Sequence, residues 1–257
     1  MIEFQNIVKK FNVGTPDETT LFDSFNLSVK EGEFVSVVGS NGSGKTTMLN
    51  LLCGSLPIDG GKILIGGKDI SKMSEHMRAR KIGRVFQDPQ KGSAASLTIL
   101  ENMALAYNKN KPYSLTPAIS KKNIDYFRTR LEACNMGLED RLDVRVGSLS
   151  GGQRQALALV IANMSDINTL ILDEHTAALD PKSSERIMEL TDMFVKENGV
   201  TALMVTHNLR FAVEYGSRLI MMDKGKIVLD KAGKEKQNTS IDDILTLFNR
   251  ISIECGN

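Results

Sequence analysis

The chain has 257 residues, of which 41% are hydrophobic and 25% are charged, and its formal net charge is only +1. This size and apolar content suit one large α/β domain, or one domain that carries an insert. The small net charge argues against a broad nucleic-acid-binding surface, and no apolar stretch approaches the roughly 18 residues of a membrane span.

The cysteines and the basic clusters indicate the kind of environment and partner. Cys53, Cys134 and Cys255 are odd in number and lack metal-ligand spacing, which favours a reducing compartment over a disulfide framework or a zinc site. No secretion signal opens the chain. The basic clusters at 76–84 and 224–236 are interpreted as solvated faces, in preference to nucleic-acid grooves. We therefore expect a soluble, cytosolic protein that binds no nucleic acid.

Strand-like runs separated by turns dominate the first third of the chain. They fall at 2–8, 21–29, 34–38, 62–65 and 82–86. A helical stretch at 47–52 interrupts them. From residue 87 to about 168 the pattern is helical, and Thr98 and Glu101 have the spacing of a capping box.

The last third returns to strands that alternate with helices. Strand-like runs lie at 169–172, 200–205 and 218–222, and Asp180-Pro181 has the form of a helix start. This alternation predicts a parallel sheet covered on both faces. Apolar residues at helical spacing in 241–251 predict a terminal helix that packs back on the core.

A glycine-rich run at 39–46 matches the phosphate-binding pattern G-x-x-x-x-G-K-[ST] with no mismatch. It lies between an apolar strand and a helical stretch, which is the context that such a loop needs, so a plain glycine-rich turn is the weaker interpretation. Backbone amides and the helix N-terminus would hold a phosphate, Lys45 would reach its outer oxygens, and Thr46 would bind Mg²⁺. The predicted nucleoside triphosphate contacts are Gly39, Ser40, Asn41, Gly42, Ser43, Gly44, Lys45, Thr46 and Thr47.

Two further segments carry candidate chemistry. Leu149-Ser150-Gly151-Gly152-Gln153 predicts a turn that opens a helix and offers a hydroxyl and free amides to a second phosphate contact. Asp173 and Glu174 follow an apolar strand, in which successive side chains point in different directions. Asp173 could therefore hold Mg²⁺ while Glu174 faces the attacking water. An exposed acidic strand end is the alternative, which the phosphate loop in the same chain disfavours.

The order of these motifs, with Gln87 between them and His207 after them, resembles the ATP-binding subunit of ABC transporters. The resemblance runs from the first strand to about residue 230. It implies a single α/β domain over 1–257 with a P-loop NTPase (RecA-like) core. An N-terminal antiparallel β subdomain and this core would comprise 1–86 and 169–257, and an inserted helical subdomain, 87–168, would carry the LSGGQ motif.

The resemblance also implies a head-to-tail homodimer that traps two ATP molecules. Ser150, Gly151, Gly152, Gln153 and Asp180 would contact the nucleotide of the partner subunit. Glu174, His207 and Gln87 would be catalytic, and Thr46, Gln87 and Asp173 would hold Mg²⁺. Phe11 would stack on adenine, and His207 would contact the γ-phosphate, although a core histidine at a strand end remains the alternative for His207.

One departure from the family pattern follows the two acids. The usual Pro-Thr-Ser-Ala-Leu-Asp is replaced by His175-Thr-Ala177-Ala-Leu-Asp180, and losing proline loosens the backbone beside Glu174. We interpret His175 as a surface substitution, in preference to an added catalytic group. With the segment 87–96 and LSGGQRQALAL, this variant resembles a bacterial subgroup of tryptophan/tyrosine-type import ATPases.

The resemblance predicts an ATPase motor of a bacterial importer of amino acids or similar small solutes. It would lie peripherally on the cytoplasmic face of the membrane, with a transmembrane permease docked at 88–96 and a separate solute-binding protein. The alternatives are an exporter or lipoprotein-extracting complex and, less favoured, a soluble ABC ATPase of repair or translation. The chain has a single set of motifs, and few residues separate Lys45 from Asp173 in the sequence. Both features disfavour the soluble class. The motifs do not encode the cargo, the direction of transport or the identity of the permease.

Overall fold

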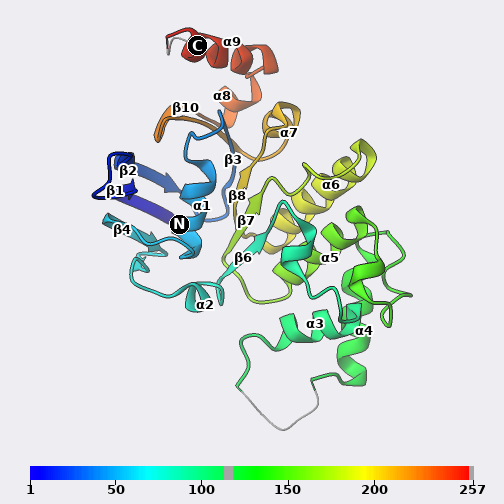
Figure 1. The fold of residues 1–257 in the computed structure, drawn as a ribbon. Coiled ribbons are helices and arrows are strands. Elements are labelled where there is room, and N and C mark those ends of the chain that lie inside the picture. The colour runs from blue at the N-terminus through cyan, green and yellow to red at the C-terminus, as the bar shows by residue number, and fades with distance from the viewer. Residues whose placement is uncertain (113–117, 255–257) are drawn as a thin grey trace. The chain divides into compact units, whose positions relative to one another are not determined.

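The computed structural model describes residues 1–112 and 118–254 (Figure 1), so Cys255 and the end of the loop before residue 118 lie outside the described residues. Its contacts divide the chain into two compact units. The first unit comprises Met1–Ala79 and Val200–Asn257, and the second comprises Arg80–Gly199.

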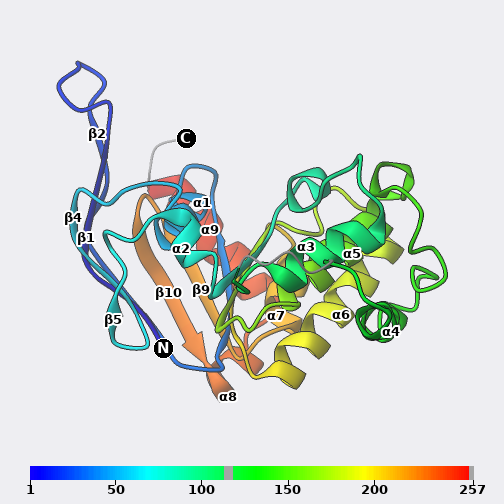
Figure 2. The same cartoon turned by 90° about the horizontal axis from the view of Figure 1, so that it is seen from below.

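An antiparallel sheet opens the first unit (Figure 2). Its strand order is β2 (Thr19–Val29), β1 (Ile2–Phe11), β4 (Gly60–Ile65) and β5 (Lys68–Asp69). Ile2 of β1 lies opposite Val29 of β2 on one side and Ile65 of β4 on the other. The predicted strands at 2–8, 21–29 and 62–65 are confirmed, and the first two extend further than their apolar pattern.

The phosphate-loop strand lies inside a second sheet of the first unit. Here β3 (Phe34–Gly39) runs parallel to β8 (Thr201–Val205) on one side and to β9 (Arg218–Asp223) on the other, and β10 (Lys226–Ala232) pairs antiparallel with β9. Every residue of β3 is buried, as expected of a central parallel strand.

Helices of the first unit cover these strands. They are α1 (Lys45–Cys53), α2 (Glu75–Arg78), α7 (Leu209–Glu214), α8 (Gly233–Gln237) and α9 (Ile241–Glu254). Ile244 of α9 is buried in a cluster with Val38 and Leu219, and Leu247 and Phe248 pack against that cluster. The predicted return of the terminal helix to the core is therefore confirmed for Ile244 and Phe248, whereas Ile241 and Leu245 of the same predicted stripe are exposed.

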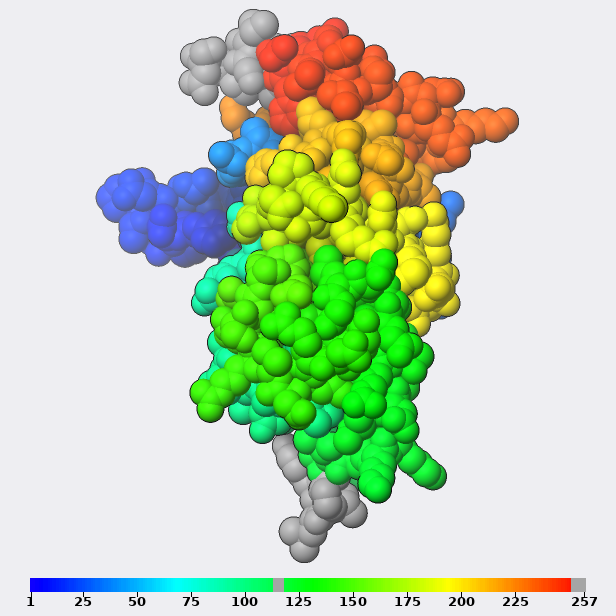
Figure 3. Space-filling model, turned by 90° about the vertical axis from the view of Figure 1, so that its right-hand side faces the viewer, coloured from blue at the N-terminus to red at the C-terminus, as the bar shows by residue number. Residues whose placement is uncertain are grey.

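The second unit pairs two parallel strands with a set of helices. The strands are β6 (Ile82–Val85) and β7 (Thr169–Asp173), in the register Val85 beside Leu172. The helices are α3 (Ile99–Asn108), α4 (Lys121–Glu132), α5 (Gly151–Asn163), α6 (Pro181–Asn198) and the short turns η1 (Pro89–Gly92) and η2 (Val146–Ser148). In the space-filling view, the green and yellow atoms of this unit form one continuous surface (Figure 3). The capping box of Thr98 and Glu101 is confirmed at the start of α3.

Two residues of the predicted solvated faces are buried. Arg78 is 5% exposed and donates to the carbonyls of Leu51 (2.7 Å) and Leu52 (3.0 Å), near the C-terminal end of α1. Burial lowers the pKa of the Arg78 guanidinium. Lys236 is 3% exposed and donates to the carbonyl of Tyr215 at 2.9 Å. The solvated-face interpretation is wrong for these two side chains, because they satisfy backbone carbonyls that water does not reach.

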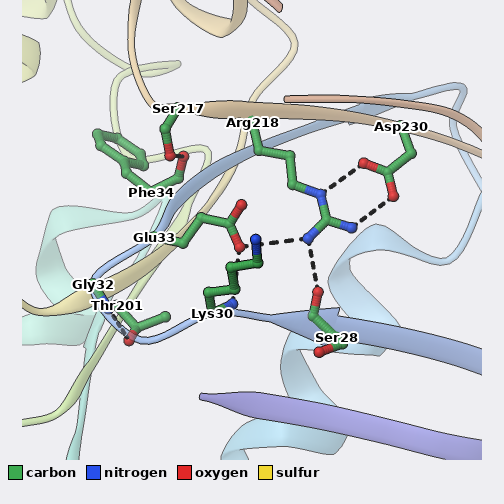
Figure 4. Close-up of polar contacts among 9 residues, drawn as sticks. All are labelled: Ser28, Lys30, Gly32, Glu33, Phe34, Thr201, Ser217, Arg218 and Asp230. Atoms are coloured by element: carbon green, nitrogen blue, oxygen red, sulfur yellow. Dashed lines mark hydrogen bonds and ion pairs between the residues drawn. The ribbon is translucent and has the colours of Figure 1, made fainter. Parts of the chain in front are cut away.

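A charged network joins three segments of the first unit (Figure 4). The Arg218 guanidinium donates to both carboxylate oxygens of Asp230, each at 2.6 Å, and to the Ser28 carbonyl at 2.7 Å. It also lies 3.4 Å from a carboxylate oxygen of Glu33. Such a planar, bidentate arrangement requires arginine, and the hydrogen bonds that Arg218 donates to Asp230 raise the pKa of Arg218. The network holds the ends of β2, β9 and β10 together beside the start of β3.

Candidate active site

The phosphate loop of the first unit is built on glycine. β3 ends at Gly39, and Gly44 is the N-cap of α1 with φ of 104°. A Cβ atom on Gly44 would lie 2.9 Å from Cζ of Phe22, and one on Gly39 would lie 2.2 Å from the Met222 carbonyl oxygen. Neither position accepts a side chain, so the tight approach of the loop to its neighbours depends on these two glycines.

The amino group of Lys45 lies inside this loop. Lys45 is 5% exposed, and its Nζ donates to the carbonyl oxygens of Gly39 (2.8 Å) and Ser40 (2.9 Å). Thr46 follows in the first turn of α1 with an exposed side chain. The loop therefore combines a buried cation with the backbone amides of a helix N-terminus, a combination that attracts phosphate.

The first unit contains two other residues that the sequence predicts to contact the nucleotide. His207 is exposed and follows β8, in which Val205 lies beside Val37 of β3, so the histidine is at the sheet edge where the loop begins. Exposure excludes the interpretation of His207 as a core histidine. Phe11 ends β1 and is half-buried, with Nζ of Lys9 5.5 Å from its ring centroid.

Asp223 is a polar partner of the loop that sequence reasoning missed. Its Oδ1 accepts a hydrogen bond from the Ser40 hydroxyl at 2.9 Å. The signal was present in the sequence, since Asp223 follows the strand-like run at 218–222 as Asp173 follows the run at 169–172.

The second unit carries the two acids. Asp173 ends β7 and is mostly buried, and its Oδ2 lies 2.7 Å from a terminal nitrogen of Arg84 on the neighbouring strand β6. Glu174 is half-buried and has φ of +49°, a left-handed conformation that costs a non-glycine residue of order 1–3 kcal/mol. Sequence reasoning missed Arg84, because the ion pair depends on the register of two strands far apart in the chain.

His175 is not at the surface, so its interpretation as a surface substitution is wrong. It is 2% exposed, and its Nε2 lies 3.1 Å from the hydroxyl oxygen of Thr191 on α6. Burial lowers the pKa of His175 to about 3, so the imidazole is neutral near pH 7. Its partner lies on α6, 16 residues further along the chain, so no local pattern indicates that this polar ring is buried.

The LSGGQ segment forms a rigid helix start in the second unit. Ser150 is the N-cap of α5, its hydroxyl accepts from the Gln153 amide at 3.3 Å, and Oε1 of Gln153 accepts from the Ser150 amide at 3.2 Å. Ser150 and Gly151 are exposed, whereas the Gln153 side chain also donates to the Met136 carbonyl of its own unit. A Cβ atom on Gly152 would lie 3.0 Å from the Ser183 hydroxyl.

Gln87 and Asp180 complete the predicted residues of the second unit. Gln87 is exposed, and the carbonyl of the preceding Phe86 accepts from the fully buried Gln155 side chain of α5 at 3.1 Å. Asp180 is the N-cap of α6, as predicted, and the Ser183 hydroxyl and amide hold the pKa of Asp180 below its usual range. The predicted residues thus fall into two groups, one in each unit.

Each unit offers one oxygen donor of the kind that Mg²⁺ prefers. Thr46 of the first unit offers an exposed hydroxyl, and Asp173 of the second unit offers a carboxylate whose Oδ2 lies 2.7 Å from a terminal nitrogen of Arg84. Among residues 1–112 and 118–254, no group of three histidine, cysteine or acidic side chains could by itself enclose a metal. Mg²⁺ is commonly held by one or two protein oxygens together with phosphate oxygens and water, so a single donor in a unit is compatible with a Mg²⁺ ion bound with its nucleotide.

Comparisons with known proteins establish the class. A family model described as ABC transporter matches residues 22–177. A tyrosine transport ATP-binding protein of Clostridioides difficile (strain R20291) is 42% identical over 96% of this chain and 98% of its own length. A phosphonates import ATP-binding protein of Alcaligenes faecalis is 32% identical over 90% of this chain and 82% of its own length.

A solved structure agrees with these relatives. A dimeric ATP-binding cassette in a post-hydrolysis state, bound to ADP and Pi, has a TM-score of 0.75 and is 31% identical over 90% of this chain and 98% of its own. The chain belongs to the ABC transporter family, and it is an ATP-hydrolysing cassette subunit of a transporter. The predicted P-loop NTPase fold with an antiparallel β subdomain is confirmed. In the part of the chain that the structure describes, no helix is both long and apolar enough to cross a membrane.

Proposed function

We propose that this chain is the ATPase motor of a bacterial importer of amino acids or similar small solutes. The observation that carries the proposal is the 42% identity, over nearly the full length of both chains, with a relative named for tyrosine transport. In this role the subunit lies peripherally on the cytoplasmic face of the membrane, bound to a transmembrane permease that receives solute from a separate binding protein.

The proposed nucleotide contacts of the first unit follow from its local geometry. Lys45 and the amides of 39–47 bind the outer phosphates, and the Thr46 hydroxyl binds Mg²⁺. His207 contacts the γ-phosphate from the end of β8, and Phe11 stacks on adenine. Base–aromatic stacking contributes about 1–3 kcal/mol in nucleic-acid systems, so Phe11 would strengthen binding without deciding it.

The proposed catalytic contacts come from the second unit. Glu174 polarises the attacking water, while Asp173 and Gln87 hold the hydration shell of Mg²⁺. The ion neutralises charge that develops on the phosphate oxygens. Because Gln155 of α5 holds the carbonyl before Gln87, movement at Gln87 would be passed to the helix that begins with the LSGGQ segment.

The proposed dimer is head-to-tail, with Ser150, Gly151, Gly152, Gln153 and Asp180 serving the nucleotide of the partner subunit. The exposed Ser150 hydroxyl and the N-terminus of α5 suit an anionic ligand from outside the unit. The permease would dock on 88–96, where the Asn102 side chain holds both the amide (2.8 Å) and the carbonyl (3.0 Å) of Ala94.

The Ser150→Arg variant tests this shared site. We expect it to bind ATP as a monomer with unchanged affinity but to lose hydrolysis, because arginine blocks the contact to the partner's phosphate. Mixing it with the Lys45→Ala variant should restore activity, since each heterodimer then contains one site with an intact phosphate loop and an intact Ser150. Steady-state phosphate release from the mixture measures this recovery. Mixtures that stay inactive at every ratio would contradict catalysis across two subunits.

The cargo and direction of transport are tested in cells. Deleting the gene should abolish uptake of radiolabelled tyrosine or tryptophan and leave phosphonate uptake unchanged. Wild-type protein should restore uptake and Glu174→Gln should not. The permease that co-purifies with the tagged subunit from native membranes identifies the complex. Normal amino-acid uptake in the deletion strain, or efflux lost in place of uptake, would refute the importer and favour another cargo or an exporter.

A further inference from the structure

The turn after β7 holds Glu174 in a conformation that its own residue type does not favour. Its φ of +49° lies in the left-handed region, where a side chain with a Cβ atom is crowded. Such a backbone persists only when its surroundings determine it strongly. No proline follows Glu174 to restrict the chain, so other contacts must keep the turn in place.

A buried hydrogen-bond chain supplies one such contact within the second unit. The Thr191 hydroxyl donates to the Ile187 carbonyl at 2.7 Å, so its oxygen accepts a hydrogen bond from the Nε2–H group of His175 at 3.1 Å. His175 is 2% exposed and Thr191 is fully buried. The imidazole next to Glu174 is thereby fixed in both tautomer and direction against α6.

A second contact comes from the same face of α6. The Ser184 hydroxyl donates to the Thr176 carbonyl at 3.1 Å, and Ser184 is itself buried. Ser184 and Thr191 are separated by two helical turns, so one stripe of α6 holds the chain at two successive residues after Glu174. Within the turn, the Ala177 amide donates to the Glu174 carbonyl at 2.9 Å.

The arrangement suits a support and not a proton carrier. The His175 ring is buried and neutral, and both hydroxyls on α6 are engaged with protein groups. Neither the imidazole nor the two hydroxyls face solvent, so they are not exposed to a water molecule or a nucleotide. These hydrogen bonds can instead hold the backbone that directs the Glu174 carboxylate.

We propose that His175 and Thr191 are positioning residues for Glu174. Their hydrogen bond restrains the backbone beside Glu174, as the proline of the family pattern would at position 175. The inference rests on the proposed role of Glu174 as the base that polarises water. Its consequence is that loss of the hydrogen bond lowers turnover without weakening nucleotide binding.

The Thr191→Val variant removes the acceptor while keeping the shape of the side chain. We expect kcat to fall about 10-fold or more, since small misplacements of a catalytic group can cost up to about 100-fold, with the affinity for a fluorescent ATP analogue unchanged. Thr191→Ser keeps the hydroxyl and should restore most of kcat. Thr169→Val, the same change at the buried first residue of β7, is the matched control and should leave kcat near wild type.

A double-mutant cycle separates positioning from general destabilisation. In the Glu174→Gln background, Thr191→Val should have no further effect on the residual turnover, because the group that it positions is already absent. An equal fold-loss in both backgrounds would overturn the inference. If Glu174→Gln abolishes turnover and Thr191→Val leaves kcat unchanged, only the positioning role fails. Wild-type turnover in Glu174→Gln would refute the proposed function itself, and the positioning role with it.

A second pair of variants covers the case in which Thr191→Val does not fold. His175→Gln can present an amide N–H at a similar reach, whereas His175→Leu fills the space without a donor. We expect the glutamine variant to keep most of kcat and the leucine variant to lose about as much as Thr191→Val. Equal kcat in the two folded variants would contradict the hydrogen bond as the positioning element.

Discussion

Replacing Glu174 with glutamine is expected to lower ATP turnover by about 10²–10⁴, because a positioned general base contributes that much to a rate. The substitution keeps the size of the side chain, so the affinity for MgATP should stay near that of the wild type. Trapped ATP should then hold the subunits together, and light scattering should show a stable dimer on addition of MgATP.

The control for this variant is a glutamate of the same unit with no proposed role. Glu197 is exposed near the C-terminal end of α6, and Glu197→Gln should hydrolyse ATP at the wild-type rate. Steady-state phosphate release under saturating MgATP compares the three proteins. Turnover of Glu174→Gln within a factor of two of the control would remove Glu174 from the mechanism.

The Lys45→Ala variant is expected to fail earlier, at nucleotide binding. Losing a charged hydrogen bond to the outer phosphates should weaken the ATP affinity about 10- to 100-fold, which corresponds to the usual strength of such bonds. Equilibrium titration with a fluorescent ATP analogue measures the change, and the same titration with AMP should differ little from wild type, since AMP lacks the outer phosphates.

Two further variants separate charge from loop structure. The Lys45 amino group also holds the carbonyls of Gly39 and Ser40, so Lys45→Met retains the aliphatic stem while removing the charge. It should weaken ATP binding as much as Lys45→Ala. Lys68→Ala, an exposed change on β5 of the same unit, should leave the affinity unchanged. Unaltered ATP binding by both Lys45 variants would refute the phosphate-loop assignment.

Local spacing was enough to predict the features that depend on near neighbours in the chain. The glycine loop between β3 and α1, the capping box at Thr98, the helix start at Ser150 and the N-cap at Asp180 each involve residues within a few positions of one another. The apolar runs also indicated the strands, because a buried parallel strand needs continuous apolar residues. The order of these segments carried the family assignment.

The contacts between distant segments were decided only by the tertiary structure. Arg84 meets Asp173 because β6 and β7 pair in one particular register, and Arg78 is buried because α1 ends with carbonyls that need donors. His175 was misjudged as a surface residue for the same reason: its polarity was visible in the sequence, but its partner Thr191 lies on α6. A polar residue can be buried at low cost only where a distant group completes its hydrogen bond, and the position of that group is set by packing and not by spacing.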